Sequence, residues 1–399
     1  MPLSPTDSAC PEKRLLLHCA RTRIQPPIEK KIQELAAGPL DWDFVLSDAA
    51  DNAITPLLNL HLRGAAANIA PQRQMDRLNS LARANAVRSL LLAAELIKIV
   101  DRFRFEGIEA IPYKGPVLAA QAYGDVSMRE FEDLDIILRQ RHMAKANEIM
   151  VSLGYAARFP WILSPGAAAS LIPGEYNYRD EVHRVMVELH TEVTLRHFPL
   201  PPDLDDLAKR LVTVGLSGHE VRTFGPEDGL ILLCIHGAKD FWERLSWVAD
   251  ISELVQAQPG LDWDQVFGRA ESWHTRRMLH LGLALAERLL DAPLPPEIAS
   301  RVREDREATS LASEAERRLL SRGWQPLDAA GRLRFRRRTM EGYLAGWNYS
   351  LRLAVVPAEE DWLSMRLPRS LAPLYVAFRP FRLLLKYGMR DSRSARPSG

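Results

Sequence analysis

The sequence of 399 residues is poor in cysteine, has no excess of charge of one sign and contains no long apolar run. Its three cysteines, Cys10, Cys19 and Cys234, are too few for a disulfide framework and lack the spacing of a zinc site. This favours a reducing compartment. No stretch approaches the roughly 18 apolar residues of a spanning helix, and the first residues lack a signal-peptide pattern. We therefore expect a cytoplasmic protein without stable membrane insertion.

The charge balance is nearly neutral overall but uneven along the chain. The formal net charge is +1, from 52 Lys and Arg against 51 Asp and Glu. Proteins that bind nucleic acid usually carry a basic excess, so the net charge does not indicate such a partner, although one remains possible. Residues 366–399 nevertheless hold eight Lys or Arg and one acid, Asp391. The length allows two or three compact units.

Residues 108–138 carry the pattern around which the chain is organised. The first part, 108–113, has alternating apolar residues and predicts a short strand. The Lys-Gly-Pro sequence at 114–116 predicts a turn that opens a helix, because glycine frees the backbone and proline suits the first helical position. We expect that helix over 117–123 and a second strand over 133–138.

Two aspartates, Asp133 and Asp135, begin the second expected strand. Residues two apart share a face of a strand, so both carboxylates point the same way, about 6 to 7 Å apart. They repel each other unless a cation lies between them, and carboxylates are ligands of Mg²⁺. Other acidic pairs have this spacing, for example Asp203 and Asp205, so the alternative is a solvated strand start whose acids cap a helix. Only Asp133 and Asp135 follow a Lys-Gly turn and lead directly into an aliphatic strand.

The central candidates for a site share a chemistry of phosphate and metal binding. They are Lys114, Gly115, Arg129, Asp133, Asp135 and Glu188. Glu188 lies in a strand expected over 182–193, which a polar turn joins to a shorter strand over 176–178. Three carboxylates on adjacent strands could hold two Mg²⁺ (or Mn²⁺) ions that bind a triphosphate and activate an acceptor hydroxyl. The residue types therefore favour transfer of a nucleotidyl group.

The turn and the two basic residues would bind the phosphates. Backbone N–H groups at Gly115 would hold phosphate oxygens, while Lys114 and Arg129 would neutralise the β and γ phosphates. The alternatives are a surface lysine at 114 and, for Arg129, a salt bridge to its neighbours Glu130 or Glu132.

Two histidines and a second lysine are accessory candidates. His190 shares a strand face with Glu188, so it could orient that carboxylate or take a proton from the acceptor; it could also be a half-buried histidine bonded to backbone. His236 and Lys239 lie one turn apart in a helix expected over 227–239. They could line the site from the second half of the chain, or His236 could belong to the core.

Most of the remaining chain is expected to be helical. A long helix over 71–105 leads into the central stretch, and its apolar residues follow helical spacing. From about residue 201 helices dominate. The other expected helices cover 28–37, 141–152, 203–211, 227–239, 242–256, 263–291, 297–320, 332–353 and 371–387.

These elements predict an α+β fold with helical regions on both sides of a small mixed sheet. We expect an N-terminal helical region over 1–105, an α/β core over 106–200 and a C-terminal helical domain over 201–390. A disordered tail is expected over 391–399.

Two basic segments have alternative interpretations. The run Arg-Leu-Arg-Phe-Arg-Arg-Arg at 332–338 could grip phosphates or form a solvated helix face. The segment 371–387 mixes apolar and basic residues and could lie on an anionic membrane surface. Because prolines interrupt it, it could instead dock on the protein's own core.

The sequence IPYKGPVLAAQAYGDVSMREFEDLDIIL at 111–138 resembles the signature of the uncharacterised bacterial nucleotidyltransferase family of the DNA polymerase β-type superfamily. The likeness continues through the acid-Leu-His pattern at 188–190 and the His…Leu-x-Trp-x-x-Asp stretch at 236–250. Asp361-Trp362, Leu367-Pro368 and Arg379-Pro380 resemble its C-terminal pattern. Together these motifs span about residues 40 to 388.

The resemblance implies a polymerase β-type core and assigns roles to residues of this chain. Asp133, Asp135 and Glu188 become metal ligands, and the nucleotide contacts become Lys114, Gly115 and Arg129. Many enzymes of the superfamily have Gly-Ser at this turn, whereas Lys-Gly is shared with abortive-infection toxin nucleotidyltransferases. The hydroxyl contact of that serine is therefore missing here.

The implied reaction transfers a nucleoside monophosphate from an NTP to a hydroxyl of a peptide, protein, RNA or small molecule, with release of pyrophosphate. A first alternative is a toxin-like enzyme that adds nucleotides to tRNA, which would need a continuous basic groove from Arg334–Arg338 to the site. A second alternative is a non-catalytic protein that senses nucleotides or binds a partner.

Overall fold

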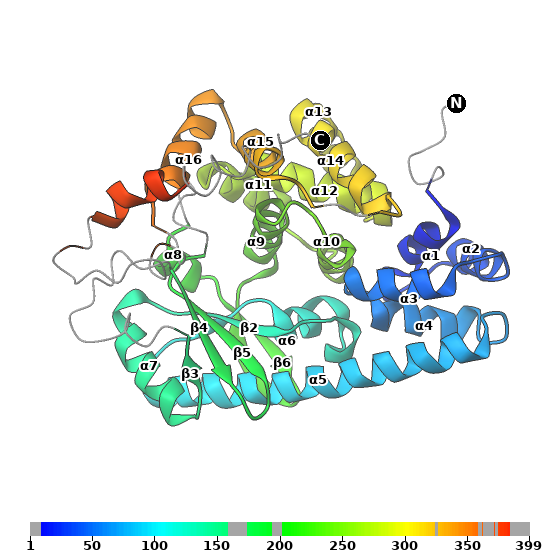
Figure 1. Ribbon diagram of the computed structural model, residues 1–399, viewed down its shortest axis with the longest axis horizontal. Coiled ribbons are helices and arrows are strands. Elements are labelled where there is room, and N and C mark those ends of the chain that lie inside the picture. Colours follow the sequence, from blue (N-terminus) through cyan, green and yellow to red (C-terminus); the bar gives the residue numbers. More distant parts are fainter. Residues whose placement is uncertain are drawn as a thin grey trace, which may run out of the picture.

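The computed structural model describes residues 9–158, 174–193, 202–323, 326–357, 361, 371 and 374–383. These residues form an α+β structure in which a small sheet lies below the helices of the second half of the chain and to one side of the first helices (Figure 1). The predicted tail over 391–399 lies outside the described residues, as do residues 372, 373 and 384–387 of the segment over 371–387.

The first helices pack together at one end of the molecule. They are α1 (Pro11–Cys19), α2 (Pro26–Ala36), α3 (Trp42–Asp51) and α4 (Thr55–Ala65). The long helix predicted over 71–105 is confirmed as α5 (Gln72–Phe105), which runs beneath both these helices and the sheet in Figure 1. Its first turns bury Met75 and Leu78 in the helical core, while its last turns bury Ile99 and Phe103 against the sheet.

The sheet contains five strands in the order β1-β2-β5-β4-β3. They are β1 (Ile111–Pro112), β2 (Asp133–Ile137), β3 (Ala156–Ala157), β4 (Glu175–Asp180) and β5 (Val185–His190). β2 and β5 pair in parallel, and the other neighbours pair antiparallel. The strand predicted over 108–113 is reduced to two residues, since Pro112 has no N–H to extend the ladder.

The predicted turn and helix between the first two strands are present. α6 (Gly115–Leu118) continues as the π-helical turn η1 (Ala119–Tyr123), which ends at Gly124 with a left-handed φ of +73°. The 3₁₀ turn η2 (Val126–Met128) then leads toward β2. After β2 come the 3₁₀ turn η3 (Gln140–His142) and α7 (Met143–Ser152).

The sheet has one apolar and one polar face. Alternate residues of β2 and β5 are fully buried, among them Leu134, Ile136 and Val187, and they join a core with α5 and α7. The residues between them point to the opposite face. That face carries the acidic residues of β2 and β5, so the strand pattern itself places them together.

The second half of the chain begins with a short helix and a hairpin. The helix predicted over 203–211 is only α8 (Leu204–Ala208), and β6 (Val212–Leu216) and β7 (His219–Thr223) follow it. Ser217 and Gly218 both have positive φ, as the tight turns that suit a twisted hairpin require. The prediction that helix dominates from residue 201 was therefore wrong over this hairpin.

The remaining elements are helices, most of which pack into one core with α1–α4. They are α9 (Pro226–Lys239), α10 (Leu245–Ala257), α11 (Trp263–Ser272), α12 (Arg276–Leu290), α13 (Pro296–Glu304), α14 (Arg306–Leu320), α15 (Ala329–Thr339) and α16 (Tyr343–Val355). Residues 374–383 are also helical.

Three long helices predicted from periodicity are each two helices. The break before α12 contains His274 with φ +55°, and the break before α16 contains Gly342 with φ +83°. The break before α14 is Asp305, whose Oδ1 accepts a hydrogen bond from the N–H of Ala308 at 3.0 Å and so caps the new helix. Apolar periodicity continues across these breaks, because both halves face the same core.

Asn52, directly after α3, joins the N-terminal helices to α10. Its Oδ1 accepts a hydrogen bond from the N–H of Leu245 at 3.0 Å, and its backbone O accepts one from the N–H of Ser246 at 3.2 Å. α10 has no side-chain cap of its own. The first turn of α10 is therefore completed by a residue from the other end of the chain.

No helix in the described ranges combines the length and the apolar character that crossing a membrane requires.

The division of the chain into units at residues 105, 200 and 390 stays a prediction.

We expect a His18→Gln variant to lose less stability in mild acid than the wild type. Burial, helped by the nearby positive charges of Lys31 and Arg21, lowers the pKa of His18 in α1 to about 4. Between about pH 6.5 and 4 the unfolded chain therefore binds a proton that the folded protein does not, so stability falls as the pH falls through this window. The free energies of unfolding measured with urea at pH 7.5 and 4.5 should differ less in the variant, by about 1 to 2 kcal/mol. The same change at the exposed His219 should leave the difference as in the wild type.

Candidate functional site

A cleft of about 1800 Å³ opens over the polar face of the sheet. Its floor is formed by residues of β2, β4 and β5 and by the turn at Lys114 and Gly115. Its walls come from α3, α5, α9 and α10, and Arg379 also lines it. Both helical groups thus contribute to a cleft whose floor is the sheet.

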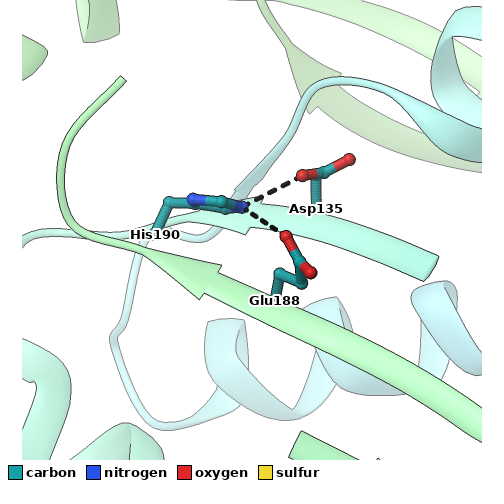
Figure 2. A group of neighbouring side chains, drawn as sticks. All are labelled: Asp135, Glu188 and His190. Atoms are coloured by element: carbon teal, nitrogen blue, oxygen red, sulfur yellow. Dashed lines mark hydrogen bonds and ion pairs between the residues drawn. The ribbon is translucent and has the colours of Figure 1, made fainter. Parts of the chain in front are cut away.

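Three side chains converge on the floor of the cleft, as Figure 2 shows: Asp135 from β2 with Glu188 and His190 from β5. Asp135 and Glu188 are directly opposite each other in the parallel pair. The Nε2 atom of His190 lies 3.0 Å from Oδ1 of Asp135 and 3.5 Å from Oε2 of Glu188. The pairing of β2 with β5 therefore brings together residues that are more than fifty positions apart.

Asp133 lies two residues before Asp135 on the same strand and also lines the cleft. It does not belong to the close group of Asp135, Glu188 and His190. Burial raises the pKa of Asp133 to about 6, and the negative charges of Asp135 and Glu188 contribute. The three carboxylates therefore repel one another, which is the condition that a bound cation relieves.

Asp135 is stabilised as an anion by the two basic side chains beside it. Burial alone would raise its pKa, but Lys114 and His190 hold it well below its usual range. Nζ of Lys114 lies 3.5 Å from Oδ1 of Asp135. His190 responds in the opposite sense: burial would lower its pKa, but hydrogen bonds to Asp135 and Glu188 raise it to about 9. At neutral pH the pair is an imidazolium beside a carboxylate.

The Lys-Gly turn lies directly against β2. Lys114 is largely buried, and its Nζ lies 4.8 Å from the centre of the Tyr113 ring. Gly115 has a φ of +50°, and a Cβ atom there would lie 3.4 Å from the backbone O of Asp133. Glycine is therefore required by the backbone conformation at the point where the turn approaches the acidic strand.

We expect a Gly115→Ala variant to be destabilised by about 1 to 2 kcal/mol, because a left-handed backbone is unfavourable for alanine. Relief of that strain would shift the turn relative to Asp133, so the nucleotidyl transfer predicted from the sequence should fall about tenfold or more. Thermal unfolding and transfer of label from an α-labelled NTP measure the two effects.

Gly64 in α4 is the matched control, since a Cβ there meets no atom within 4 Å. Gly64→Ala should be neutral or stabilising by up to about 1 kcal/mol. Equal effects of the two substitutions would contradict the special role of the turn.

Arg129 is held by Asp250, a residue for which no role was predicted. Its Nε and Nη2 atoms donate to the two carboxylate oxygens of Asp250 in α10, at 2.7 and 2.9 Å. Tyr123 donates a third hydrogen bond to Asp250 at 2.7 Å. The partner is neither Glu130 nor Glu132, the alternatives drawn from neighbouring residues. Asp250 is the last residue of the Leu-x-Trp-x-x-Asp motif, and this motif was the sequence feature that could have indicated a role for Asp250.

His236 and Lys239 of α9 line the cleft wall. Nδ1 of His236 lies 3.2 Å from Oδ2 of Asp240, and its ring meets Trp247 edge to face at 5.1 Å. Burial, followed by the charges of Lys114 and Lys239, lowers the pKa of His236 well below its usual range. It is therefore a neutral histidine on the cleft wall.

The basic run of α15 makes internal contacts. Arg336 donates to the backbone O of Lys239 and to the hydroxyl of Tyr349, while Arg338 pairs with Glu307 and Glu314. Within the described ranges, no residue of 334–338 lines the cleft. The basic groove that a tRNA acceptor would need is therefore not formed by this run, and its interpretation as a merely solvated face was also wrong for these two arginines.

The donors on the cleft floor fit a divalent metal ion. Ligand atoms of Asp135, Glu188 and His190 all lie within 4.8 Å of one another, and Asp133 adds a carboxylate on the same strand face. Oxygen-rich sets of this kind hold Mg²⁺ or Mn²⁺. The charge repulsion at Asp133 is the observation that such an ion would account for.

Comparison with known proteins bears on the same residues. The family model described as "Uncharacterised nucleotidyltransferase" matches residues 38–291, more than half of the chain. No curated protein matches it. The matched region starts before α3, ends after α12 and contains the acidic strands, the Lys-Gly turn, Arg129 and Asp250. The α+β fold predicted from the sequence is confirmed, and the chain belongs to this family of uncharacterised nucleotidyltransferases.

Proposed function

We propose that the protein is a metal-dependent nucleotidyltransferase that moves a nucleoside monophosphate from an NTP to a hydroxyl acceptor and releases pyrophosphate. The observation that carries the proposal is the alignment of Asp135 with Glu188 across the parallel strands, beside Asp133 and the Lys-Gly turn, on the floor of one cleft. Family membership supports nucleotidyl transfer in general. The metal, the residue roles and the acceptor are parts of the proposal.

Asp133, Asp135 and Glu188 would hold the metal ions, of which two are expected. When bound, the ions supply positive charge to the triphosphate and lower the pKa of the acceptor hydroxyl. Burial and the negative charges of Asp135 and Glu188 raise the pKa of Asp133. Bound cations would relieve this repulsion among the three carboxylates.

Lys114 and the turn at Gly115 would position the phosphates. Lys114 already lies at the edge of the acidic group, 3.5 Å from Asp135, and can turn to a phosphate once a metal ion balances that carboxylate. Asp250 fixes two nitrogens of Arg129, so a phosphate contact by Arg129 would come from a guanidinium of set orientation. The acceptor oxygen then attacks the α-phosphorus, the bond to the β-phosphate oxygen breaks, and the hydroxyl proton passes to a carboxylate of the site or to water.

Label transfer tests the function directly. Each α-labelled NTP is incubated with Mg²⁺ or Mn²⁺ and a cell extract, beside an Asp133→Ala/Asp135→Ala double variant. Label on an extract component with the wild type only would support transfer, and the labelled species would give the acceptor class. Metal-dependent NTP binding without transfer would favour the non-catalytic alternative, whereas neither binding nor transfer would refute the role of the acidic strand.

The charges of the cleft favour a neutral or cationic acceptor over RNA. Apart from the proposed metal ligands Asp133, Asp135 and Glu188, the acidic residues that line it equal the Lys and Arg in number, so the cleft has no basic excess. Several of its basic residues are also committed to other groups of the protein: Lys13 to Asp48, Arg379 to Asp361, and Arg88 to the backbone oxygens of His183 and Arg184. RNA binding requires basic residues that neutralise phosphates.

We therefore expect transfer to a lysine-rich peptide with serine and threonine hydroxyls to exceed transfer to tRNA by at least about tenfold, since the cleft outside the metal site has no excess of positive charge to neutralise the phosphates of tRNA. Transfer to the peptide should weaken as salt rises. Parallel label-transfer assays at 50 and 300 mM salt measure both effects. A preference for tRNA would favour the toxin-like alternative.

A further inference from the structure

His190 lies where a ligand of the metal ion would lie. Two ligands at right angles on an ion with bonds of about 2.1 Å are about 3 Å apart. Nε2 of His190 is 3.0 Å from Oδ1 of Asp135 and 3.5 Å from Oε2 of Glu188. Figure 2 shows both carboxylates pointing to this single nitrogen. Two of the three separations are thus close to those of adjacent ligands on one ion, and all three ligand atoms lie within 4.8 Å of one another.

The position of the ring is fixed by rigid neighbours. His190 is the last residue of β5, and its backbone O accepts a hydrogen bond from the N–H of Leu138 at 2.9 Å. Its side chain is only 12% exposed, and Tyr113 meets its ring edge to face at 5.9 Å. Such a ring needs little movement to bind an ion beside Asp135, which is the requirement for a preorganised ligand. Because the ring is protonated at neutral pH without metal, the ion would displace the proton from Nε2, and that proton would pass to water.

A second histidine of the cleft faces a different carboxylate. His236 lines the same cleft, but its Nδ1 faces Asp240 and it lies outside the group of close metal-ligand atoms. The two histidines therefore differ in geometry and not in access to the cleft, which makes His236 a matched control.

We propose that His190 is a nitrogen ligand of the ion at Asp135 and Glu188, and that the site prefers Mn²⁺ or a similar transition-metal ion over Mg²⁺. Imidazole binds first-row transition metals well, whereas Mg²⁺ favours a shell of oxygens. This proposal rests on the proposed function, because it names the cofactor class of the same site. Asp133, outside the close group, then remains for a second ion.

Mn²⁺ alone is a sufficient probe, because its electron spin reports on its ligands. Electron spin echo spectra of the Mn²⁺-loaded full chain should show coupling to an imidazole ¹⁴N, and labelling histidine with ¹⁵N should change it. The coupling should persist in His236→Gln and disappear in His190→Gln and Asp135→Asn. Mn²⁺ binding by calorimetry should weaken about 10- to 100-fold in His190→Gln, while Mg²⁺ binding should change less than about threefold. His190→Leu repeats the test without an amide that could replace the ring.

The results that would overturn the role of His190 differ from the result that would overturn the proposed function. Mn²⁺ bound at Asp135 without nitrogen coupling, or an unchanged Mn²⁺ to Mg²⁺ ratio in both His190 variants, would overturn the role of His190 and leave metal-dependent transfer standing. Absence of Mn²⁺ binding by the wild type would overturn both.

Discussion

Replacing Asp135 by asparagine should lower kcat for nucleotidyl transfer by at least about 10³-fold, equivalent to about 4 kcal/mol of transition-state stabilisation. Asp135 lies opposite Glu188 and contacts His190 and Lys114. Its negative charge therefore positions the two basic side chains on the floor of the cleft. Asparagine keeps the size of the side chain but not the charge that binds a cation. Single-turnover label transfer with saturating NTP measures the loss.

The control is Asp51→Asn. Asp51 is exposed and lines the same cleft, so its substitution changes the charge of the cleft without touching the acidic strands. We expect it to stay within about threefold of the wild type. Thermal unfolding should show that both variants are folded. An Asp135→Asn enzyme with nearly normal kcat would exclude Asp135 as a metal ligand.

Replacing Asp250 by alanine should destabilise the protein by about 3 to 5 kcal/mol, because it leaves the guanidinium of Arg129 buried without its partner. The side chains of Arg129 and Asp250 are only 9% and 1% exposed, so water cannot compensate. The Tyr123 hydroxyl would lose its acceptor as well. Urea unfolding measures the change, and NTP binding below the transition tests whether the segment before β2 moves.

Two further variants distinguish a general loss of protein stability from a displacement of Arg129 at the cleft. Arg129→Met/Asp250→Ala should be more stable than Asp250→Ala alone, since the unpaired charge is gone. Asp228→Asn removes a fully buried carboxylate that pairs with Arg210 and Arg269 away from the cleft. It should cost stability but leave NTP binding of the folded protein unchanged. Loss of NTP binding in Asp228→Asn would show that general destabilisation is enough to account for the effect.

The local features of the site were predictable because neighbouring residues encode them. The strand at Asp133, the turn at Gly115 and the helix that ends at Gly124 all follow from sequence signals within a few positions. The alternation of acidic and apolar residues also put Glu188 and His190 on one strand face. The register that places Glu188 opposite Asp135 depends on strands far apart in the chain, and no local pattern fixes it.

The features that were missed depend on contacts over long distances or on single backbone positions. Arg129 and Asp250 are 121 residues apart, so neighbouring glutamates seemed to be the available partners. The helix break at Asp305 needs only one capping residue, and the apolar period on either side conceals it. The hairpin at 212–223 has the alternating residues of strands, but lies among strongly helical segments.

The contact of Asn52 with α10 has a consequence for any shortened form of the protein. A chain that began after Asn52 would leave the N–H groups of Leu245 and Ser246 without the acceptors that now satisfy them. The first turn of α10 would then fray, and Asp250 follows in the next turn. The helices that precede the sheet therefore stabilise the helix whose Asp250 orients Arg129. Faster protease cleavage near residue 245 would indicate that α3, and Asn52 with it, had moved away from α10.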